Sequence, residues 1–257
     1  MRTSTRPLYP MVYRSKPTRF RMFADRLRRV GIGVQKMVIA VDVDGTLFDG
    51  SGVADEAVTA LSQARADGHT LVIVTGRRWE GLESVVPSVI ALANRIVCEE
   101  GGVIVDVDTG QPRLLAEAIE PDLIAGLVDA GVPALDIGHV VVGAPTSSLA
   151  VVTAVRDRLA SHRIIVTNKG SIALTPKGCD KGTGLRAAIA ELQLQDLPIL
   201  AIGDAENDLP MFEVATIAVG VANADDAVRA SGVPLTTASV GLGVAEALRR
   251  YLPRATG

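Results

Sequence analysis

Four apolar runs of this sequence are each followed by side chains that could bind a metal ion or an anion. These side chains are Asp42 with Asp44, Thr75, Glu99 with Glu100, and Asp204 with Asp208. A partly buried cluster of carboxylates repels itself unless protons or cations intervene. Mg²⁺ prefers oxygen ligands and typically uses one or two carboxylates together with phosphate oxygens of a substrate. The sequence therefore predicts an Mg²⁺ site formed by Asp42, Asp204 and Asp208, with the backbone carbonyl of Asp44.

Strand and helix signals alternate from Met37 onward, which predicts βαβ units and a mostly parallel sheet. The predicted strands cover residues 37–41, 70–74, 95–98, 198–202, 217–219 and 235–237. The predicted helices cover residues 53–66, 78–93, 182–194, 225–230 and 244–251. Ligands bind beyond the carboxyl ends of the strands in such sheets. The polar side chains that follow the apolar runs should therefore converge at one edge.

The pattern changes between residues 112 and 176, where helices and strands predict a small α+β unit. Helices are expected at 121–130 and 147–160, and strands at 139–142, 163–167 and 171–175. The turn Asn168-Lys169-Gly170 makes the last two strands a hairpin, so this unit has antiparallel pairing. We interpret residues 112–176 as an insertion into an α/β core formed by residues 37–111 and 177–257.

The composition fits this α/β interpretation and excludes several other classes of protein. Hydrophobic residues make up 48% of the 257 residues and aromatic residues only 3%, so the core is expected to be aliphatic. The net charge of −3 gives no reason to expect nucleic-acid or membrane binding. No stretch approaches the roughly 20 apolar residues of a membrane span. The two cysteines, Cys98 and Cys179, lack metal-ligand spacing and are expected as buried thiols, which favours a cytoplasmic location.

The first 36 residues differ from the rest because they hold ten basic side chains and one acidic side chain, a charge of +9. The remainder has 16 basic and 28 acidic side chains and a charge of −12. This segment could form a basic amphipathic helix for an anionic surface, or a transit peptide. The favoured interpretation is a basic N-terminal extension that is disordered, or sequence upstream of a start at Met37.

Four segments of the chain carry a family resemblance. In order, they are Asp42-Val43-Asp44-Gly45-Thr46, Thr75-Gly76-Arg77, Lys181 and Gly203-Asp204-Ala205-Glu206-Asn207-Asp208. Their order and spacing resemble the four motifs of the haloacid dehalogenase-like (HAD) phosphatases. The block 112–176 resembles the type IIB cap of that family, inserted between motifs II and III. The resemblance implies a HAD-like doubly wound parallel sheet, and the chain is most similar to archaeal-type phosphoglycolate phosphatases.

The resemblance also implies roles for the site residues. Asp42 would be the nucleophile that forms an aspartyl-phosphate, and Asp44 would be the general acid and base. Asp42 and Asp44 lie two residues apart at a strand end and point to the same side, which suits this division of work. The substrate would be bound by Thr75, Gly76, Lys181 and Asn207. The Mg²⁺ would be bound by Asp42, Asp44, Asp204 and Asp208.

Simpler interpretations of single residues stay open. Arg77 could serve only as an ion-pair partner, and Lys181 could be a solvated residue at the start of a helix. Asp208 could be an acidic residue that the dipole of a helix favours at its N-terminus. Asn207 could cap that helix instead of contacting substrate.

The expected function is a Mg²⁺-dependent phosphatase that hydrolyses a small phosphomonoester, with phosphoglycolate as first substrate and sugar phosphates second. The expected partner is this small molecule alone, and the protein would be a monomer or homodimer. A phosphomutase or phosphotransferase of the phosphomannomutase type is the alternative, and a non-catalytic binding module is a third class. The family resemblance implies Asn at the position where this sequence has Glu100. A carboxylate at this position would repel an acidic leaving group, which counts against phosphoglycolate.

Overall fold

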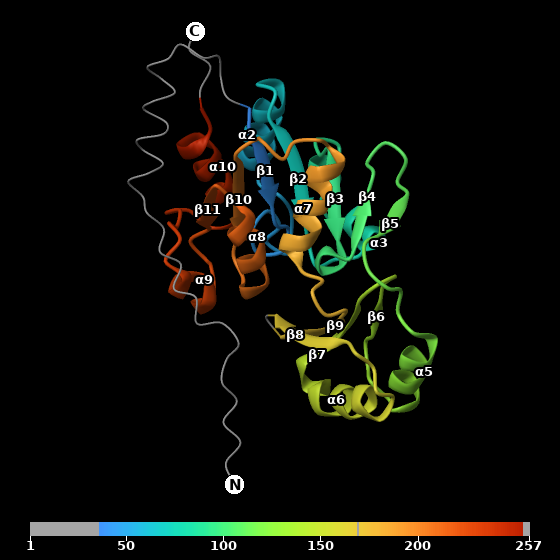
Figure 1. Cartoon of the computed structure of the whole chain (residues 1–257). Helices are drawn as coiled ribbons and strands as arrows, with labels where there is room; N and C mark the ends of the chain where they lie inside the picture. Colours follow the sequence, from blue (N-terminus) through green and yellow to red (C-terminus); the bar gives the residue numbers. More distant parts are fainter. Residues whose placement is uncertain (1–35, 169, 254–257) are drawn as a thin grey trace.

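The protein folds into a large α/β core and a smaller α+β unit, which faces the carboxyl ends of the parallel strands of the core sheet (Figure 1). The structure, a computed structural model, describes residues 36–168 and 170–253. The predictions for the basic segment 1–36, except Lys36, and for Lys169 in the hairpin turn concern residues outside these ranges.

The core sheet has seven strands in the order β11-β10-β1-β2-β3-β4-β5. The strands from β11 to β3 are parallel, and β4 and β5 add an antiparallel edge. The strands are β1 (Val38–Val41), β2 (Thr70–Val74), β3 (Arg95–Cys98), β4 (Val103–Val105), β5 (Pro112–Leu114), β10 (Ile199–Gly203) and β11 (Ile217–Gly220). This arrangement confirms the predicted α/β core with a parallel sheet.

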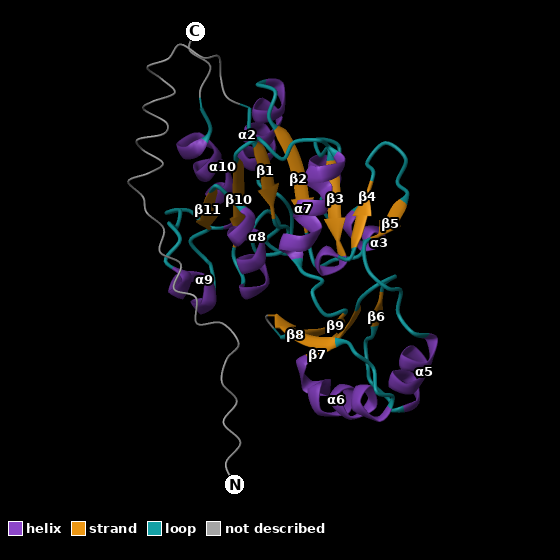
Figure 2. Cartoon of the chain, in the orientation of Figure 1, coloured by secondary structure: helices purple, strands orange, loops and turns teal. Residues whose placement is uncertain are grey.

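Helices cover both faces of the core sheet (Figure 2). Ile39 and Val41 of β1 belong to the hydrophobic cluster that holds α2 (Asp55–Ala66) and α10 (Val240–Tyr251), together with α3 (Trp79–Leu82) and α4 (Pro87–Ile90). Val38 and Ala40 belong to the cluster that holds α7 (Lys181–Glu191), α8 (Leu209–Val214) and α9 (Asp226–Ser231). Because alternate side chains of a strand point to opposite faces, β1 is apolar at every position.

The smaller unit is a four-stranded antiparallel sheet in the order β6-β7-β9-β8 with two helices. Its helices pack on the sheet face that points away from the core (Figure 1). The helices are α5 (Pro121–Asp129) and α6 (Leu149–Arg158). The strands are β6 (Asp136–Ile137), β7 (Val142–Pro145), β8 (Ile164–Asn168) and β9 (Ser171–Thr175). This arrangement confirms the predicted α+β cap.

The first residues of the predicted insertion belong to the core. Pro112–Leu114 pair with β4 as the last strand of the large sheet. Leu115 and Ala116 then pack against the two hydrophobic clusters of the core. We therefore define the cap as residues 117–176, and we call the remaining described residues the core.

Three predicted elements differ from the structure. The predicted helix 78–93 is two short helices, because Pro87 keeps Val86 out of helical geometry (φ −133°, ψ 48°). The predicted strand 139–142 is wrong for its first residues, because the N–H groups of 139–141 donate to the side chain of Glu99 instead of to a strand. The predicted strand 235–237 is a single bridge between Leu235 and Gly220.

Two expectations about the chain as a whole can be compared with the structure. Cys98 and Cys179 are buried and free, as predicted. Among the helices of the described residues, none has the length and apolar character that crossing a membrane requires.

Candidate active site

Three predicted metal ligands come together where β1 and β10 end. These strands are parallel neighbours, with Val41 level with Ile202, so the residues that follow them meet at one edge of the sheet. Carboxylate oxygens of Asp42, Asp204 and Asp208 all lie within 4.8 Å of one another, and all three residues are buried. Three buried carboxylates in so small a space need positive charge nearby.

Lys181 supplies part of that charge from the first turn of α7. Its Nζ lies 2.7 Å from Oδ1 of Asp42 and 2.6 Å from Oδ1 of Asp208, and its side chain is only 2% exposed. The helix begins here because Asp180 and Thr183 form a reciprocal cap. Burial lowers the pKa of Lys181, but the carboxylates of Asp208, Asp42 and Glu100 raise it by more than burial lowers it. The pKa of Lys181 therefore lies above its ordinary value. Lys181 is therefore an ammonium ion in the folded protein.

The remaining negative charge of this cluster fits a divalent cation. Burial, and then the carboxylate of Asp208, raise the pKa of Asp42 well above its ordinary value even with Lys181 present. One ammonium group thus leaves three buried carboxylates incompletely compensated. Their oxygen donors are the kind that Mg²⁺ prefers, so the residues present fit that ion.

The loops around this cluster are shaped to hold the carboxylates. The Thr46 hydroxyl donates to Oδ1 of Asp204 at 3.0 Å, and the N–H groups of Asp204 and Ala205 donate to Oδ2 of Asp208 at 2.8 and 3.0 Å. Gly45 has φ +81°, and a Cβ at this position would lie 2.3 Å from Oδ2 of Asp204. A residue without a side chain is therefore required where this loop approaches Asp204.

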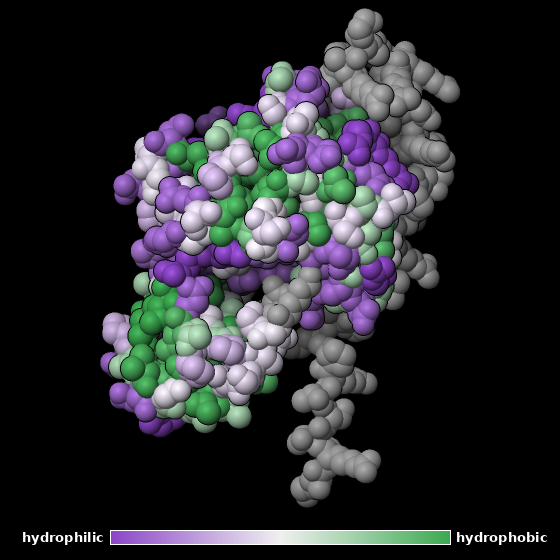
Figure 3. Space-filling view, turned by 180° about the vertical axis from the view of Figure 1, so that it is seen from behind, coloured by the Kyte–Doolittle hydropathy of each residue, from purple (hydrophilic) through white to green (hydrophobic). Residues whose placement is uncertain are grey.

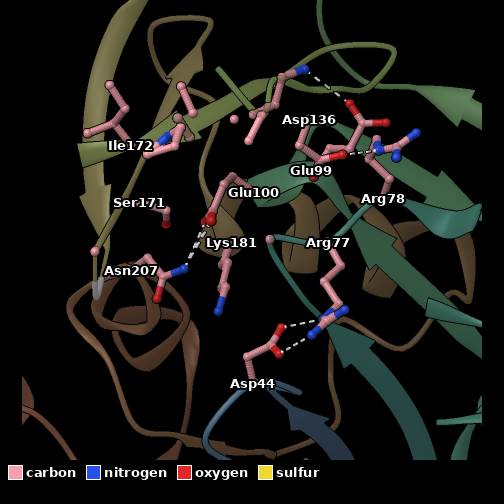
Figure 4. Close-up of a pocket in the computed structure, with 18 of the residues that line it drawn as sticks. Asp44, Arg77, Arg78, Glu99, Glu100, Asp136, Ser171, Ile172, Lys181 and Asn207 are labelled. Atoms are coloured by element: carbon pink, nitrogen blue, oxygen red, sulfur yellow. Dashed lines mark hydrogen bonds and ion pairs between the residues drawn. The ribbon is translucent and has the colours of Figure 1, made fainter. Parts of the chain in front are cut away.

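We call Asp42, Asp204 and Asp208 the three-carboxylate cluster. Asp44 lies apart from this cluster and is bound by Arg77. Arg77 donates from Nε to Oδ2 of Asp44 at 2.7 Å and from Nη2 to Oδ1 at 2.6 Å (Figure 4). The Asp44 side chain is 47% exposed, whereas the side chain of Asp42 is 4% exposed. Arg77 thus forms an ion pair, and the interpretation that it serves only as an ion-pair partner stays a prediction. The predicted metal contact through the backbone carbonyl of Asp44 stays a prediction.

Thr75 and Gly76 end β2 beside these residues. Thr75 is fully buried, and its hydroxyl oxygen accepts the N–H of Arg77 at 3.1 Å. A Cβ on Gly76 would lie 2.3 Å from Oε1 of Glu100, so the Glu100 carboxylate occupies the space above this glycine. Gly76 lines the adjoining cavity and Thr75 does not, so the predicted contact between Thr75 and substrate stays a prediction.

A cavity of about 580 Å³ lies between the core and the cap and reaches this site. Hydrophilic side chains gather along the junction of the two units in the space-filling view (Figure 3). Of the predicted site residues, Asp42, Asp44, Gly76, Lys181 and Asn207 line the cavity. Asp204 and Asp208 are completely buried beneath it.

The cap contributes a roof of mostly small residues to this cavity. The roof comes from β7 and β9 and includes Gly143, Ala144 and Ala173. Asp136 of β6 also lines the cavity and is joined to the core by Arg78, whose Nε lies 2.5 Å from Oδ1 of Asp136. Sequence reasoning missed this cross-link, because nothing in the spacing of residues 78 and 136 indicates that they meet.

Glu99 forms a second connection between core and cap. It is 1% exposed, and its carboxylate accepts the N–H groups of His139, Val140 and Val141 at 3.0, 2.7 and 3.0 Å. These donors belong to the cap segment between β6 and β7. The sequence placed Glu99 correctly at a strand end, but it carried no signal for its partners, because backbone N–H groups have no sequence signature.

The sequence and the fold have counterparts in known proteins. The haloacid dehalogenase-like hydrolase family matches residues 39–133 and 139–248 of this chain. The chain belongs to this family. This HAD-like hydrolase is 32% identical over 220 residues to a phosphoglycolate phosphatase of Methanothermobacter thermautotrophicus, which covers 83% of this chain and 98% of that protein. It is 26% identical over 231 residues to the phosphoglycolate phosphatase of Nitrosopumilus maritimus, covering 86% and 98% of the two chains.

Solved structures of low sequence identity share the fold. The Thermoplasma acidophilum protein 0175 aligns with a TM-score of 0.68 at 20% identity, covering 84% of this chain and 98% of that one. The subclass IIB sugar phosphatase BT4131 aligns with a TM-score of 0.64 at 17% identity, covering 84% and 99%. The predicted fold is confirmed, and so is the predicted enzyme class: the HAD-like hydrolase is a phosphoric monoester hydrolase.

Proposed function

We propose that this enzyme hydrolyses a small phosphomonoester by transferring the phosphoryl group to Asp42. The observation that carries the proposal is the position of Asp42 between the cavity and the buried charges. Asp42 lines the cavity, its Oδ1 binds Lys181, and its carboxylate lies within 4.8 Å of those of Asp204 and Asp208. A carboxylate so placed can attack a phosphorus atom that enters from the cavity.

The reaction divides into two displacements in this proposal. A carboxylate oxygen of Asp42 bonds to phosphorus while the ester P–O bond breaks, and the departing oxygen takes a proton from Asp44. Water then loses a proton to Asp44 and attacks the aspartyl-phosphate, which releases phosphate and restores Asp42. Asp44 lines the same cavity, and the proton that it gives up in the first displacement is restored by the water of the second.

The negative charge of the phosphoryl group must be neutralised for a carboxylate to approach it. The Lys181 ammonium supplies a fixed positive charge next to Asp42, and Gly76 brings backbone close to the cavity. Asp42, Asp204 and Asp208 would hold Mg²⁺, with the backbone carbonyl of Asp44. When bound, this ion supplies further neutralisation of the phosphoryl oxygens.

Phosphoglycolate is the first substrate to test, because relatives that align with 86% and 83% of this chain are named phosphoglycolate phosphatases. A sugar phosphate is the second, because a cavity of about 580 Å³ can accommodate a larger leaving group.

The test is phosphate release from a panel of phosphomonoesters with Mg²⁺ or with EDTA. We expect release that requires Mg²⁺, and an Asp42→Asn variant that is folded but inactive. Wild-type protein quenched during turnover should carry one phosphoryl group on Asp42. Transfer of the phosphoryl group to an added sugar hydroxyl instead of water would identify a mutase or phosphotransferase. Equal turnover by Asp42→Asn would contradict the proposal.

A further inference from the structure

The side chain of Glu100 places a carboxylate in the cavity that a substrate must enter. Burial raises the pKa of Glu100, but the Lys181 ammonium and the Asn207 amide, which donates to both carboxylate oxygens, favour its ionised form. Glu100 follows β3, lines the cavity, and extends over Gly76 beside the site (Figure 4). Its backbone is left-handed, with φ 54° and ψ 27°, which turns the side chain toward the cavity instead of along the strand. The charge is thus close to the reacting centre but outside the three-carboxylate cluster.

Asn207 fixes the position of the Glu100 carboxylate. Its Nδ2 donates to both Oε1 and Oε2 of Glu100 at 3.0 Å. The reverse orientation of the amide would set its oxygen against the carboxylate, so Glu100 fixes the amide. The Oδ1 of Asn207 is buried and has no hydrogen-bond partner among the described residues. The Asn207 amide therefore holds both oxygens of the Glu100 carboxylate in place, and Glu100 is the acceptor that this pair presents to a molecule in the cavity.

The cations of the cavity are each engaged by an acidic partner. Within the described residues, the cations that line the cavity are Arg77, Arg78 and Lys181. Arg77 binds Asp44, Arg78 binds Asp136, and Lys181 binds Asp42 and Asp208. The small residues of the cap roof add no positive charge. A carboxylate on the leaving group would therefore meet Glu100 with no compensating cation among these residues.

We propose that Glu100, held in place by Asn207, selects the leaving group, favouring hydroxyl or ammonium groups and disfavouring carboxylates. This inference rests on the proposed phosphatase activity and names its substrate class: phosphomonoesters of neutral polyols or amino alcohols. An alcohol or ammonium group donates hydrogen bonds to the Glu100 carboxylate, whereas a carboxylate can only accept. This selection predicts that a sugar phosphate, which carries hydroxyl groups, is a better substrate than phosphoglycolate.

Three probes of equal carbon skeleton test this selection. They are 2-phosphoglycolate, 2-hydroxyethyl phosphate and 2-aminoethyl phosphate, which carry a carboxylate, a hydroxyl and an ammonium group on the same two-carbon chain. The phosphoryl group is common to all three, so ratios of kcat/KM report the leaving group alone. We expect wild-type enzyme to prefer the hydroxyl and ammonium probes to phosphoglycolate.

The Glu100→Gln variant keeps the size of the side chain and removes its charge. We expect the phosphoglycolate to hydroxyethyl ratio to rise by about tenfold or more, and the aminoethyl to hydroxyethyl ratio to fall. Opposite shifts of the two ratios are a signature that a purely structural role of Glu100 would not produce. Glu100→Asn serves as a second variant if Gln does not fold. Glu206→Gln is the matched control, because Glu206 is an exposed acid beside Asn207 that does not line the cavity.

The outcomes separate a failure of the leaving-group selection from a failure of the phosphatase proposal. Unchanged ratios in folded Glu100→Gln, or a wild-type preference for phosphoglycolate, would overturn the inference and leave the phosphatase proposal standing. Release of phosphate from no compound of the panel would instead overturn the phosphatase proposal. A Lys169→Gln variant tests a cation outside the described residues. If wild-type enzyme prefers phosphoglycolate and Lys169→Gln loses this preference, that lysine supplies the missing charge and the inference is wrong.

Discussion

Arg77 donates hydrogen bonds to both carboxylate oxygens of Asp44. The proposed acid and base of the reaction, which follows β1, is therefore bound by a residue of the loop that follows β2. The two hydrogen bonds measure 2.7 and 2.6 Å, and the guanidinium carbon also lies 5.6 Å from the centre of the Phe48 ring. A planar fork that binds two oxygens restricts the rotation of a carboxylate more than a single contact does. Arg77 is therefore expected to position Asp44, and one of the two hydrogen bonds must open when Asp44 carries the proton that it donates to the leaving group.

Arg77→Gln should lower activity mainly where the leaving group needs a proton. We expect kcat/KM to fall about 100-fold for an alkyl phosphate, since a mispositioned Asp44 protonates the departing alkoxide poorly. For p-nitrophenyl phosphate the loss should be less than about tenfold, because that phenolate departs without a proton. Steady-state kinetics with both substrates check this. Equal losses would mean that Arg77 acts on the phosphoryl group and not through Asp44.

Lys181 is predicted to be essential for stability as well as for activity. Lys181→Met should destabilise the fold by about 3–5 kcal/mol, because it leaves the buried carboxylates of Asp42 and Asp208 without their ammonium partner. Denaturant unfolding in EDTA measures this. The double variant Lys181→Met with Asp208→Asn removes one of these charges and should recover part of the lost stability. If the double variant is no more stable than the single one, charge repulsion is not the cause.

The sequence predicted the core of this site well, for a reason that the sheet makes plain. Asp42 and Asp204 follow buried apolar runs, and parallel strands that are neighbours bring their carboxyl ends together. The predicted strand 70–74 has the same first and last residues as β2, because a short apolar run after Gly68 allows few alternatives. Local pattern and global fold agree at these positions.

The parts that could not be predicted depend on contacts between the core and the cap. The Glu99 carboxylate replaces a strand partner for residues 139–141, and the Arg78 to Asp136 cross-link joins segments 58 residues apart. Glu100 was visible as an unusual residue, but the amide of Asn207 that it orients was not. Such pairs are fixed by the approach of two folded units, which no local period encodes.

Magnesium should stabilise the folded protein by binding the three-carboxylate cluster. At an Mg²⁺ concentration about 100 times its dissociation constant, the gain in the free energy of unfolding should be about 2.7 kcal/mol relative to EDTA. Asp204→Asn should abolish most of this gain. Asp136→Asn, which alters a cavity carboxylate outside the cluster, should keep it. The measurement is thermal unfolding with and without Mg²⁺, and a gain that survives in Asp204→Asn would place the ion elsewhere.

Glu99 should control how firmly the cap is attached. Glu99→Gln retains the shape of the side chain but replaces one acceptor oxygen with a donor, so at least one of the three N–H bonds is lost. We expect a loss of about 1.5–3 kcal/mol in the free energy of unfolding, since the acceptor is charged and buried. Hydrogen exchange should accelerate at the amides of 139–141. Unchanged protection of these amides would show that the cap is held by other contacts.

The last prediction concerns His69, which directly precedes β2 at the end of the sheet opposite the active site and is only 1% exposed. Its Nδ1 accepts the N–H of Met37 at 3.0 Å, which only the neutral imidazole can do. Burial lowers the pKa of His69 from 6.5, and the charge of Asp67 offsets this only in part. The folded protein therefore takes up the proton less readily than the unfolded chain does.

The stability that His69 contributes is present in full above about pH 6.5, where the imidazole is neutral in both states. It should be lost progressively as the pH falls from there through the lower pKa of the folded protein. His69→Asn keeps an acceptor near the position of Nδ1 but does not titrate. Its free energy of unfolding should therefore decline less than that of the wild type between about pH 7.5 and 5.5. Parallel declines of the two proteins would exclude His69 as the source of the acid sensitivity.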